Sequence, residues 1–498
     1  MIEAIWIILI PLITAFILPL ISQYSNKLMR IIVIISGIAN LLVAVHILLR
    51  AIEQPLVYNL GAWGSRLGIN LVIDPLSALM IVLVNLISFA IIYYSLDYIT
   101  KNQSKYYLLL FLLITGMLGL VSTADLFNLY VFVEITSITS YALVAFAKKD
   151  ISFEASFKYL IMGSVSGALV LLAIILVYQS TGTLNLAQLV TQSQVISLIT
   201  KRLILALLII GFGTKFAITP LHTWLADAHP AAPSPISAIL SGVVIKVYIY
   251  ALIRILFLLF NVQELLSLDL DILLTYLGVI TLLIGHLLAY QQEELKRLLA
   301  YSTIAQVGYI IIGIGLMNSA GLEGAIYHII NHSIVKAVLF MTVGIFISKT
   351  GKTNICNLTG LGYSLPLTSF IFTISALNII GLPPLNSFIS KWLLTTAALK
   401  SGFIIPAMSI FIGSIISLSY YLRVVISLYS KSEDKIDNIL VSGKLKLPIV
   451  ILSLLYPFLS MFPNFLLSFI QEVATFLLEA INYQNILLGG EEWIGLFT

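Results

Sequence analysis

The sequence predicts an all-α, polytopic membrane protein, and three observations support this prediction. Hydrophobic residues make up 60% of the 498-residue chain, although a single soluble core stops growing beyond about 250–300 residues. Charged residues make up 10%, against roughly 25% in soluble domains. The apolar residues also gather in runs of about 20, the length of helix that crosses the hydrocarbon core. Soluble enzyme folds are therefore excluded.

These runs predict about fourteen transmembrane helices. They cover residues 4–22, 29–49, 76–98, 105–122, 125–147, 156–179, 202–226, 235–260, 270–290, 295–316, 322–348, 365–399, 403–428 and 447–468. We interpret the first run as a span and not as a signal peptide, because Glu3 is its only early charge and no basic segment precedes it. The single cysteine, Cys356, excludes a disulfide framework and a cysteine-ligated iron–sulfur cluster.

The basic residues predict the orientation of the chain. With the N-terminus outside, most Lys and Arg residues fall in inner loops, as the positive-inside rule requires, and both termini face outward. The outer side then holds Arg50, Arg66, Lys201, Arg202, Arg254 and Lys400. Between the spans we expect an outside hairpin at 51–74, an outer interfacial segment at 180–200, a cytoplasmic loop at 429–446 and an interfacial tail helix after 469.

Two of the spans are too long and are interrupted by proline. The seventh contains Pro220 and the twelfth contains Pro383 and Pro384. Proline removes a backbone donor and clashes with the preceding turn, so each helix must break or bend there. Paired interrupted helices indicate the ion site of a transporter, although proline kinks are also common in membrane helices.

The two breaks lie five spans apart, and an odd offset reverses the direction of the chain across the bilayer, so we expect inverted five-helix repeats. The expected organisation is an N-terminal three-helix segment with the outside hairpin over 1–104, a first repeat over 105–260, a second repeat over 261–430, and a loop, last span and tail over 431–498.

Five ionisable groups are expected at membrane depth, namely Glu134, Lys215, Lys246, Lys336 and Lys391. A charge at mid-bilayer costs from about 3 to over 10 kcal/mol, so such groups pair inside the bundle and usually mark an ion path. Desolvation and nearby positive charge favour the neutral form of an amine, which can then take up and release a proton. Glu134 is the natural partner of Lys215, as a switch or as a static salt bridge.

A polar stripe is expected on the eleventh span. His328, His332 and Lys336 recur every four residues, which places them on one helix face. Because histidine titrates near neutrality, the stripe is a candidate proton relay. A metal site and a hydrogen-bonded polar core are the alternatives, but no carboxylate or cysteine nearby completes a ligand set, and we expect no metal. His286 stands alone in its span and is interpreted as structural.

The segment that follows Lys215 resembles a known family. Residues 215–235 read KFAITPLHTWLADAHPAAPSP, and His222 and His229 within them could line a proton entrance at the inner end of the seventh span. With LLAYSTIAQVGY at 298–309 and GLPP at 381–384, the segment resembles the antiporter-like subunits of respiratory complex I, membrane-bound hydrogenases and Mrp-type cation/proton antiporters. The resemblance covers nearly the whole chain and implies fourteen helices, inverted repeats and a proton path along a hydrated central axis.

The resemblance also implies residue roles. The matching proton-path positions are Glu134, Lys215, Lys246, His328, His332 and Lys391. Some complex I members carry a glutamate where Lys391 stands, and the segment PAAPSP at 230–235 is closer to the D-type member of the Mrp antiporters and its hydrogenase counterpart.

The expected function is therefore that of a proton-translocating cell-membrane subunit of a multisubunit Na⁺/H⁺ antiporter of the Mrp D type. Its expected partners are the other subunits, and neither a cofactor nor nucleic acid is expected. The alternative is a proton-pumping subunit of a redox-driven complex, either a membrane-bound hydrogenase or an NADH–quinone oxidoreductase. A stand-alone solute transporter would gather its polar groups in one cluster and not in a line. A scaffold would leave the buried lysines unexplained.

Overall fold

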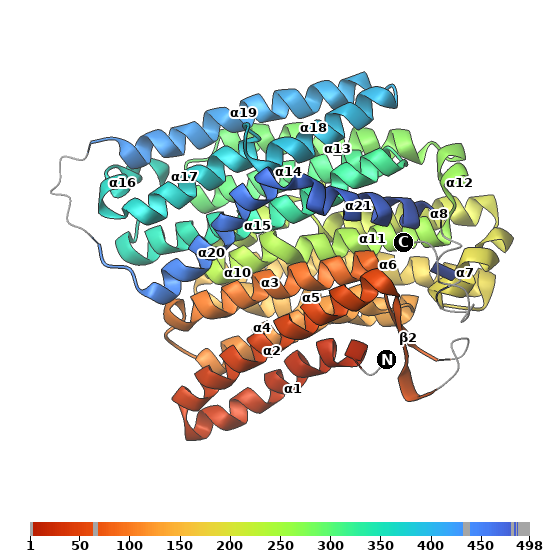
Figure 1. The fold of residues 1–498 in the computed structure, drawn as a ribbon, viewed down its shortest axis with the longest axis horizontal. Coiled ribbons are helices and arrows are strands. Elements are labelled where there is room, and N and C mark those ends of the chain that lie inside the picture. Colours follow the sequence, from red (N-terminus) through yellow and green to blue (C-terminus); the bar gives the residue numbers. More distant parts are fainter. Residues whose placement is uncertain (1–2, 63–67, 432–438, 480–482, 485, 487–498) are drawn as a thin grey trace.

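The computed structural model describes residues 3–62, 68–431, 439–479, 483–484 and 486, and these residues are almost entirely helical. Twelve of the described helices are long and apolar enough to cross a membrane. Figure 1 shows the long helices lying side by side, with the N-terminal helices in red along one edge and α19 in blue along the opposite edge. The chain is thus an all-helical polytopic membrane protein, as the sequence predicts.

The spanning helices agree with most of the predicted runs. They are α1 (Glu3–Tyr24), α2 (Asn26–Glu53), α3 (Pro75–Tyr98), α4 (Gln103–Ser122), α5 (Leu126–Val144), α6 (Asp150–Thr181), α10 (Ser234–Ile239) with α11 (Ile245–Leu259), α13 (Leu270–Tyr290), α14 (Leu295–Gly315), α15 (Ser319–Thr350), α19 (Ile404–Tyr429) and α20 (Gly443–Met461). A π-helical turn, Leu240–Val244, joins α10 to α11. The most apolar stretches of α10–α11 and α15 are fully buried, so these two segments form the centre of the bundle.

Both predicted breaks are present. Helix α8 (Leu198–Lys215) ends before Pro220, and α9 (Thr223–Ala231) follows it. Helix α17 (Pro366–Ile380) is likewise separated from α18 (Asn386–Lys400) by the segment that holds Pro383 and Pro384. Gly381 has a φ of 88°, a left-handed conformation that suits glycine.

Short elements complete the described chain. They are β1 (Leu56–Asn59), η1 (Leu60–Ala62), β2 (Asn70–Ile73), η2 (Ala145–Ala147), α7 (Leu186–Gln192), η3 (Ser193–Val195), α12 (Val262–Ser267), η5 (Ile355–Leu358), α16 (Leu361–Ser364) and α21 (Pro463–Leu478). Strands β1 and β2 pair antiparallel with Leu56 opposite Ile73, which confirms the hairpin expected within 51–74. Arg66, assigned to the same loop, lies outside the described residues.

Two expectations are wrong. The last predicted span, 447–468, crosses a helix boundary, because α20 ends at Met461 and α21 starts at Pro463, where proline suits a first helical position. Residues 469–478 therefore belong to α21, which packs against α15. Arg254, counted among the outer-side residues beyond the spans, lies buried inside the spanning helix α11.

Candidate functional site

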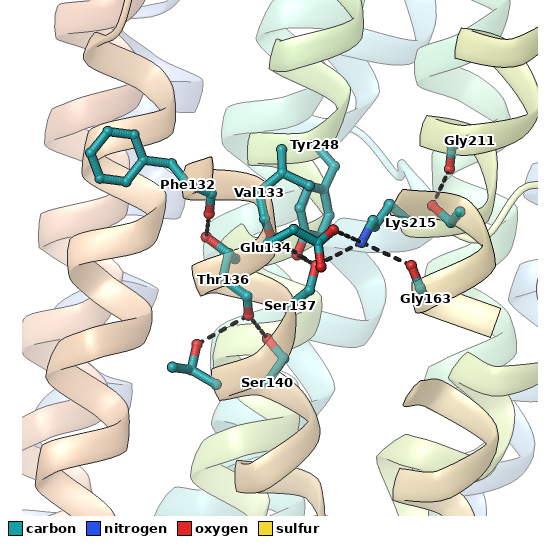
Figure 2. A network of polar contacts seen from close by, with 12 residues as sticks. Phe132, Val133, Glu134, Thr136, Ser137, Ser140, Gly163, Gly211, Lys215 and Tyr248 are labelled. Carbon is teal, nitrogen blue, oxygen red and sulfur yellow. Dashed lines mark hydrogen bonds and ion pairs between the residues drawn. The ribbon is translucent and has the colours of Figure 1, made fainter. Parts of the chain in front are cut away.

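Lys215 and Glu134 form the ion pair that the sequence predicts. Lys215 ends α8, and its Nζ lies 3.3 Å from Oε1 of Glu134 on α5; Figure 2 shows the two side chains pointing toward each other. The Lys215 side chain is 1% exposed and the Glu134 side chain is 25% exposed. Charge-assisted bonds of this kind are usually about 2.7–2.9 Å long. The amine is therefore enclosed in the bundle, and its contact with the carboxylate is loose.

Neutral groups hold the Lys215 amine more closely than the carboxylate does. Its Nζ donates to Ser137 Oγ at 2.8 Å and to the Gly163 carbonyl oxygen at 3.1 Å. The Ser137 hydroxyl is in turn 3.0 Å from the Tyr248 hydroxyl of α11, as Figure 2 shows. Because these partners remain when the carboxylate moves, the amine can change its charge without losing all of its hydrogen bonds.

Lys246 lies on α11 directly after the π-helical turn, and it is fully buried. Its Nζ donates to the carbonyl oxygen of Ser241, and the Ser241 hydroxyl is 2.8 Å from the Thr303 hydroxyl of α14. The described residues offer Lys246 no carboxylate partner. Such π-helical turns often mark functional positions in helices, and here the carbonyl oxygen of Ser241 in the turn accepts from the Lys246 amine in the centre of the bundle.

His328 on α15 has a partner on each ring nitrogen. Nδ1 is 2.9 Å from Ser390 Oγ, and Nε2 is 3.0 Å from Gln306 Oε1. A hydroxyl can donate or accept, and an amide can present either its oxygen or its NH₂ group. His328 can therefore gain or lose a proton and keep both hydrogen bonds. His332 is also fully buried, its ring centroid is 6.0 Å from that of His328, and neither of its nitrogens has a partner among the described residues.

Lys336 and Lys391 both end among hydroxyl groups and backbone carbonyls. Lys336 Nζ donates to the Leu299 carbonyl oxygen and to Ser302 Oγ, each at 2.9 Å. Lys391 Nζ donates at 2.9 Å to the carbonyl oxygen of Ile380, the last residue of α17. The second helix break thus supplies a carbonyl group for Lys391, in keeping with the rule that carbonyls at the end of a helix need outside partners.

These groups lie close enough to influence one another electrostatically. His332 is within electrostatic range of Lys246, Lys336 and Lys391, and Lys246 is within range of Lys336. The structure therefore brings the predicted groups of α11, α15 and α18 into one buried polar region. Tyr248 lies two residues after Lys246 on the same helix, and its hydroxyl contacts Ser137 in the surroundings of the Lys215 pair.

The two histidines at the first break lie inside the bundle and not on its surface. His222 is 8% exposed, and His229 is 0% exposed with its ring 4.7 Å from that of Phe340. Neither nitrogen of His229 has a hydrogen-bonding partner among the described residues. Buried imidazole nitrogens are normally hydrogen-bonded, to protein or to ordered water, so the surroundings of His229 suit a hydrated passage more than a dry core.

One buried ion pair was missed by the sequence analysis. Arg254 donates through Nη2 to Oδ1 of Asp74, the residue that caps α3, and to Ser77 Oγ at 2.9 Å. Its Nε is 2.9 Å from the Tyr250 hydroxyl. An arginine in an apolar span must find a partner. Arg254 lies eight residues after Lys246 in the same predicted span, and this position could have revealed the ion pair.

Gly167 is a second residue that the sequence analysis did not connect with the site. A Cβ placed on this glycine of α6 would lie 2.4 Å from Oε1 of Glu134. The close approach of α6 therefore fixes the room in which the carboxylate can move. A stripe of small residues on a membrane helix indicates close packing, but it does not identify the partner.

The comparisons with known proteins identify the family of the chain. The family described as "NADH:quinone oxidoreductase/Mrp antiporter, TM" matches residues 123–417, and "NADH-Ubiquinone oxidoreductase (complex I), chain 5 N-terminus" matches residues 62–107. The chain is 36% identical to the N-type subunit of NADH-quinone oxidoreductase of Desulforudis audaxviator, over 85% of this chain and 86% of that protein. It is 32% identical to the D-type subunit of the Na(+)/H(+) antiporter of Alkalihalophilus pseudofirmus, over 89% and 90%.

Two solved structures are also similar. A chain of the archaeal membrane-bound sulfane sulfur reductase has a TM-score of 0.92 and 32% identity, covering 97% of this chain and 99% of that chain. A chain of the Mrp complex from Dietzia sp. has a TM-score of 0.89 and 25% identity, covering 98% and 100%. The chain therefore belongs to the NADH:quinone oxidoreductase/Mrp antiporter family and is an antiporter-like, proton-translocating membrane subunit.

Proposed function

We propose that this chain is the D-type subunit of a multisubunit Na⁺/H⁺ antiporter and that it moves protons along its buried amines. The observation that carries the proposal is the Lys215–Glu134 pair, in which an enclosed amine contacts a partly exposed carboxylate at 3.3 Å. Two similar proteins support the choice of complex: the D-type antiporter subunit of Alkalihalophilus and the Dietzia Mrp chain. The exchanged cation would bind in another subunit, because the sequence offers no carboxylate-rich cage.

The proton route begins near His222 and His229 at the first break. It continues through Lys215, Lys246 and the pair His328 and His332, with Lys336 alongside, and ends at Lys391 beside the second break. Hydroxyl groups and ordered water carry the proton between these groups. The membrane potential supplies about 2.3 kcal/mol per charge per 100 mV, which such a relay can couple to movement of a second ion. Residues 105–260 and 261–430 would be inverted repeats, each with one broken helix.

The proposed topology follows from the same helices. If α8–α9 and α17–α18 each cross the membrane once, they bring the twelve long spans to fourteen. An even number places both termini on the same side, and the bias of the basic loop residues places that side outside the cell.

The test of this function is the Lys215→Ala variant of the native complex, reconstituted into proteoliposomes with a pH gradient. We expect proton-coupled cation transport to fall to background while the other subunits still co-purify. The matched control is Lys158→Ala, which removes a lysine whose side chain is 49% exposed and which forms surface ion pairs, and it should transport normally. Normal antiport by the Lys215→Ala variant would contradict the proposal.

A second function is favoured by two specific observations. The relative with 36% identity is named as the N-type subunit of NADH-quinone oxidoreductase, and the sulfane sulfur reductase chain has a TM-score of 0.92. In this alternative the same relay is driven by electron transfer in other subunits. Identification of the chains that co-purify with the native protein decides between them. Small antiporter subunits would support the first function, and iron–sulfur, nickel or flavin subunits would support the second.

A further inference from the structure

His286, which the sequence analysis interprets as a lone structural histidine, lies between two tyrosine hydroxyls. Its Nε2 is 3.2 Å from the Tyr309 hydroxyl of α14, and its Nδ1 is 3.1 Å from the Tyr420 hydroxyl of α19. All three side chains are fully buried. A neutral imidazole donates at one nitrogen and accepts at the other, and a phenol can do both. The three side chains therefore form a hydrogen-bonded unit that can pass a proton in either direction.

One end of this unit reaches Lys391. The Tyr309 hydroxyl lies close to Ser414, and Ser414 Oγ accepts from Lys391 Nζ at 3.1 Å. Lys391 Nζ also lies 4.6 Å from the centroid of the Tyr309 ring. A Cβ on Gly413 would lie 2.7 Å from the Tyr309 hydroxyl, so this glycine allows α19 to approach the tyrosine closely.

The other end reaches Lys336. The Tyr420 hydroxyl lies close to Ser302, whose Oγ accepts from Lys336 Nζ at 2.9 Å. Tyr421, the next residue on α19, also contacts Ser302, with 2.9 Å between the two hydroxyl oxygens. Both ends of the His286 unit therefore finish on buried amines. The buried pair of Tyr456 and Ser375 is different, since no hydrogen bond among the described residues joins it to a lysine.

We propose that His286 is the centre of a second proton route, the histidine branch, which joins Lys336 to Lys391 without using His328 or His332. The branch consists of Lys336, Ser302, Tyr420, His286, Tyr309, Ser414 and Lys391. One proton leaves the ammonium group at one end, each hydroxyl receives one proton and passes one on, and the imidazole gains a proton at one nitrogen and loses one from the other. The amine at the far end becomes an ammonium group, so no intermediate group keeps a charge.

The histidine branch rests on the proposed function, because it assumes that Lys336 and Lys391 carry protons. Its geometry differs from that of the His328 route, in which His332 has no partner among the described residues. Four of the six steps in the branch are hydrogen bonds between protein groups, and the other two, Tyr309–Ser414 and Tyr420–Ser302, are close approaches of hydroxyl groups. The branch therefore depends less on enclosed water between the two lysines than the route through His332 does.

The test uses the native complex in proteoliposomes. The starting variant combines His328→Gln with His332→Leu, which disables the first route. We expect it to keep a measurable part of the wild-type transport rate, which the histidine branch would carry. Adding His286→Gln, which can still bond both tyrosines but cannot exchange its protons between two ring nitrogens, should lower that remainder at least tenfold.

Tyr420→Phe provides a second, independent variant, because it keeps the ring and removes only the hydroxyl. It should lower the remaining transport at least tenfold, as His286→Gln does, whereas the matched control Tyr456→Phe should leave it unchanged. The branch is refuted if the starting variant shows no transport, or if its transport survives both His286→Gln and Tyr420→Phe. Wild-type rates in both Lys336→Met and Lys391→Met would instead refute the proposed function.

Discussion

Replacement of Glu134 by glutamine tests whether the first ion pair is a switch. Glutamine keeps the size and an acceptor oxygen but removes the charge. With an effective dielectric constant of about 20, opposite charges 3.3 Å apart attract by about 5 kcal/mol, and a separation of about 7 Å reduces this to about 2.4 kcal/mol. Withdrawal of the carboxylate would thus lower the ratio of charged to neutral Lys215 amine by nearly a hundredfold. The Glu134→Gln variant could not change this ratio in the same way.

The assay is proton-coupled cation uptake by proteoliposomes that hold the native complex. We expect Glu134→Gln to lower the initial rate at least tenfold, with unchanged co-purification of the other subunits. The control is Glu154→Gln, because the Glu154 side chain is 67% exposed and exposed ion pairs contribute only about 0–1 kcal/mol. A wild-type rate in Glu134→Gln would refute the switch. Full transport by the charge-swapped Glu134→Lys, Lys215→Glu variant would show instead that the pair is a static structural salt bridge.

Two further predictions concern the surroundings of the site. Gly167→Ala should displace the Glu134 carboxylate, since the added Cβ would lie 2.4 Å from Oε1; transport should fall at normal expression levels, and an unchanged rate would show that the carboxylate has spare room. Asp74→Ala should strongly reduce the yield of assembled complex, because breaking a buried pair costs about 3–5 kcal/mol. The Asp74→Leu, Arg254→Met variant should recover most of that yield, and failure of both variants alike would argue against the ion pair as the cause.

The sequence predicts the helices better than it predicts their contacts. Hydrophobicity marks each span by itself, and proline marks both breaks, because each effect acts within a few residues. The pairing of Glu134 with Lys215 was also predictable, since a lone acid in an apolar bundle needs a basic partner. The boundary between α20 and α21 at Phe462 was missed because the apolar run continues through it. Hydrophobicity alone does not reveal a turn inside such a run.

The surroundings of His286 could not be predicted in the same way. Its partners Tyr309 and Tyr420 are 23 and 134 residues away in the sequence, and tyrosine is common in membrane helices, so neither residue signals a polar contact. Arg254 and Asp74 are likewise 180 residues apart. Such contacts depend on how helices pack, and periodicity within one helix does not contain that information.

The central claim is that buried amines exchange protons through hydroxyl groups and enclosed water. A cryo-electron microscopy map of the native complex, sharp enough to show ordered water, tests it most directly. We predict a continuous series of water and hydroxyl oxygens, with gaps no longer than a hydrogen bond of about 3.2 Å, from Lys215 through Lys246 and His332 to Lys391. Dry, separate compartments around these side chains, or amines that face lipid, would contradict the claim.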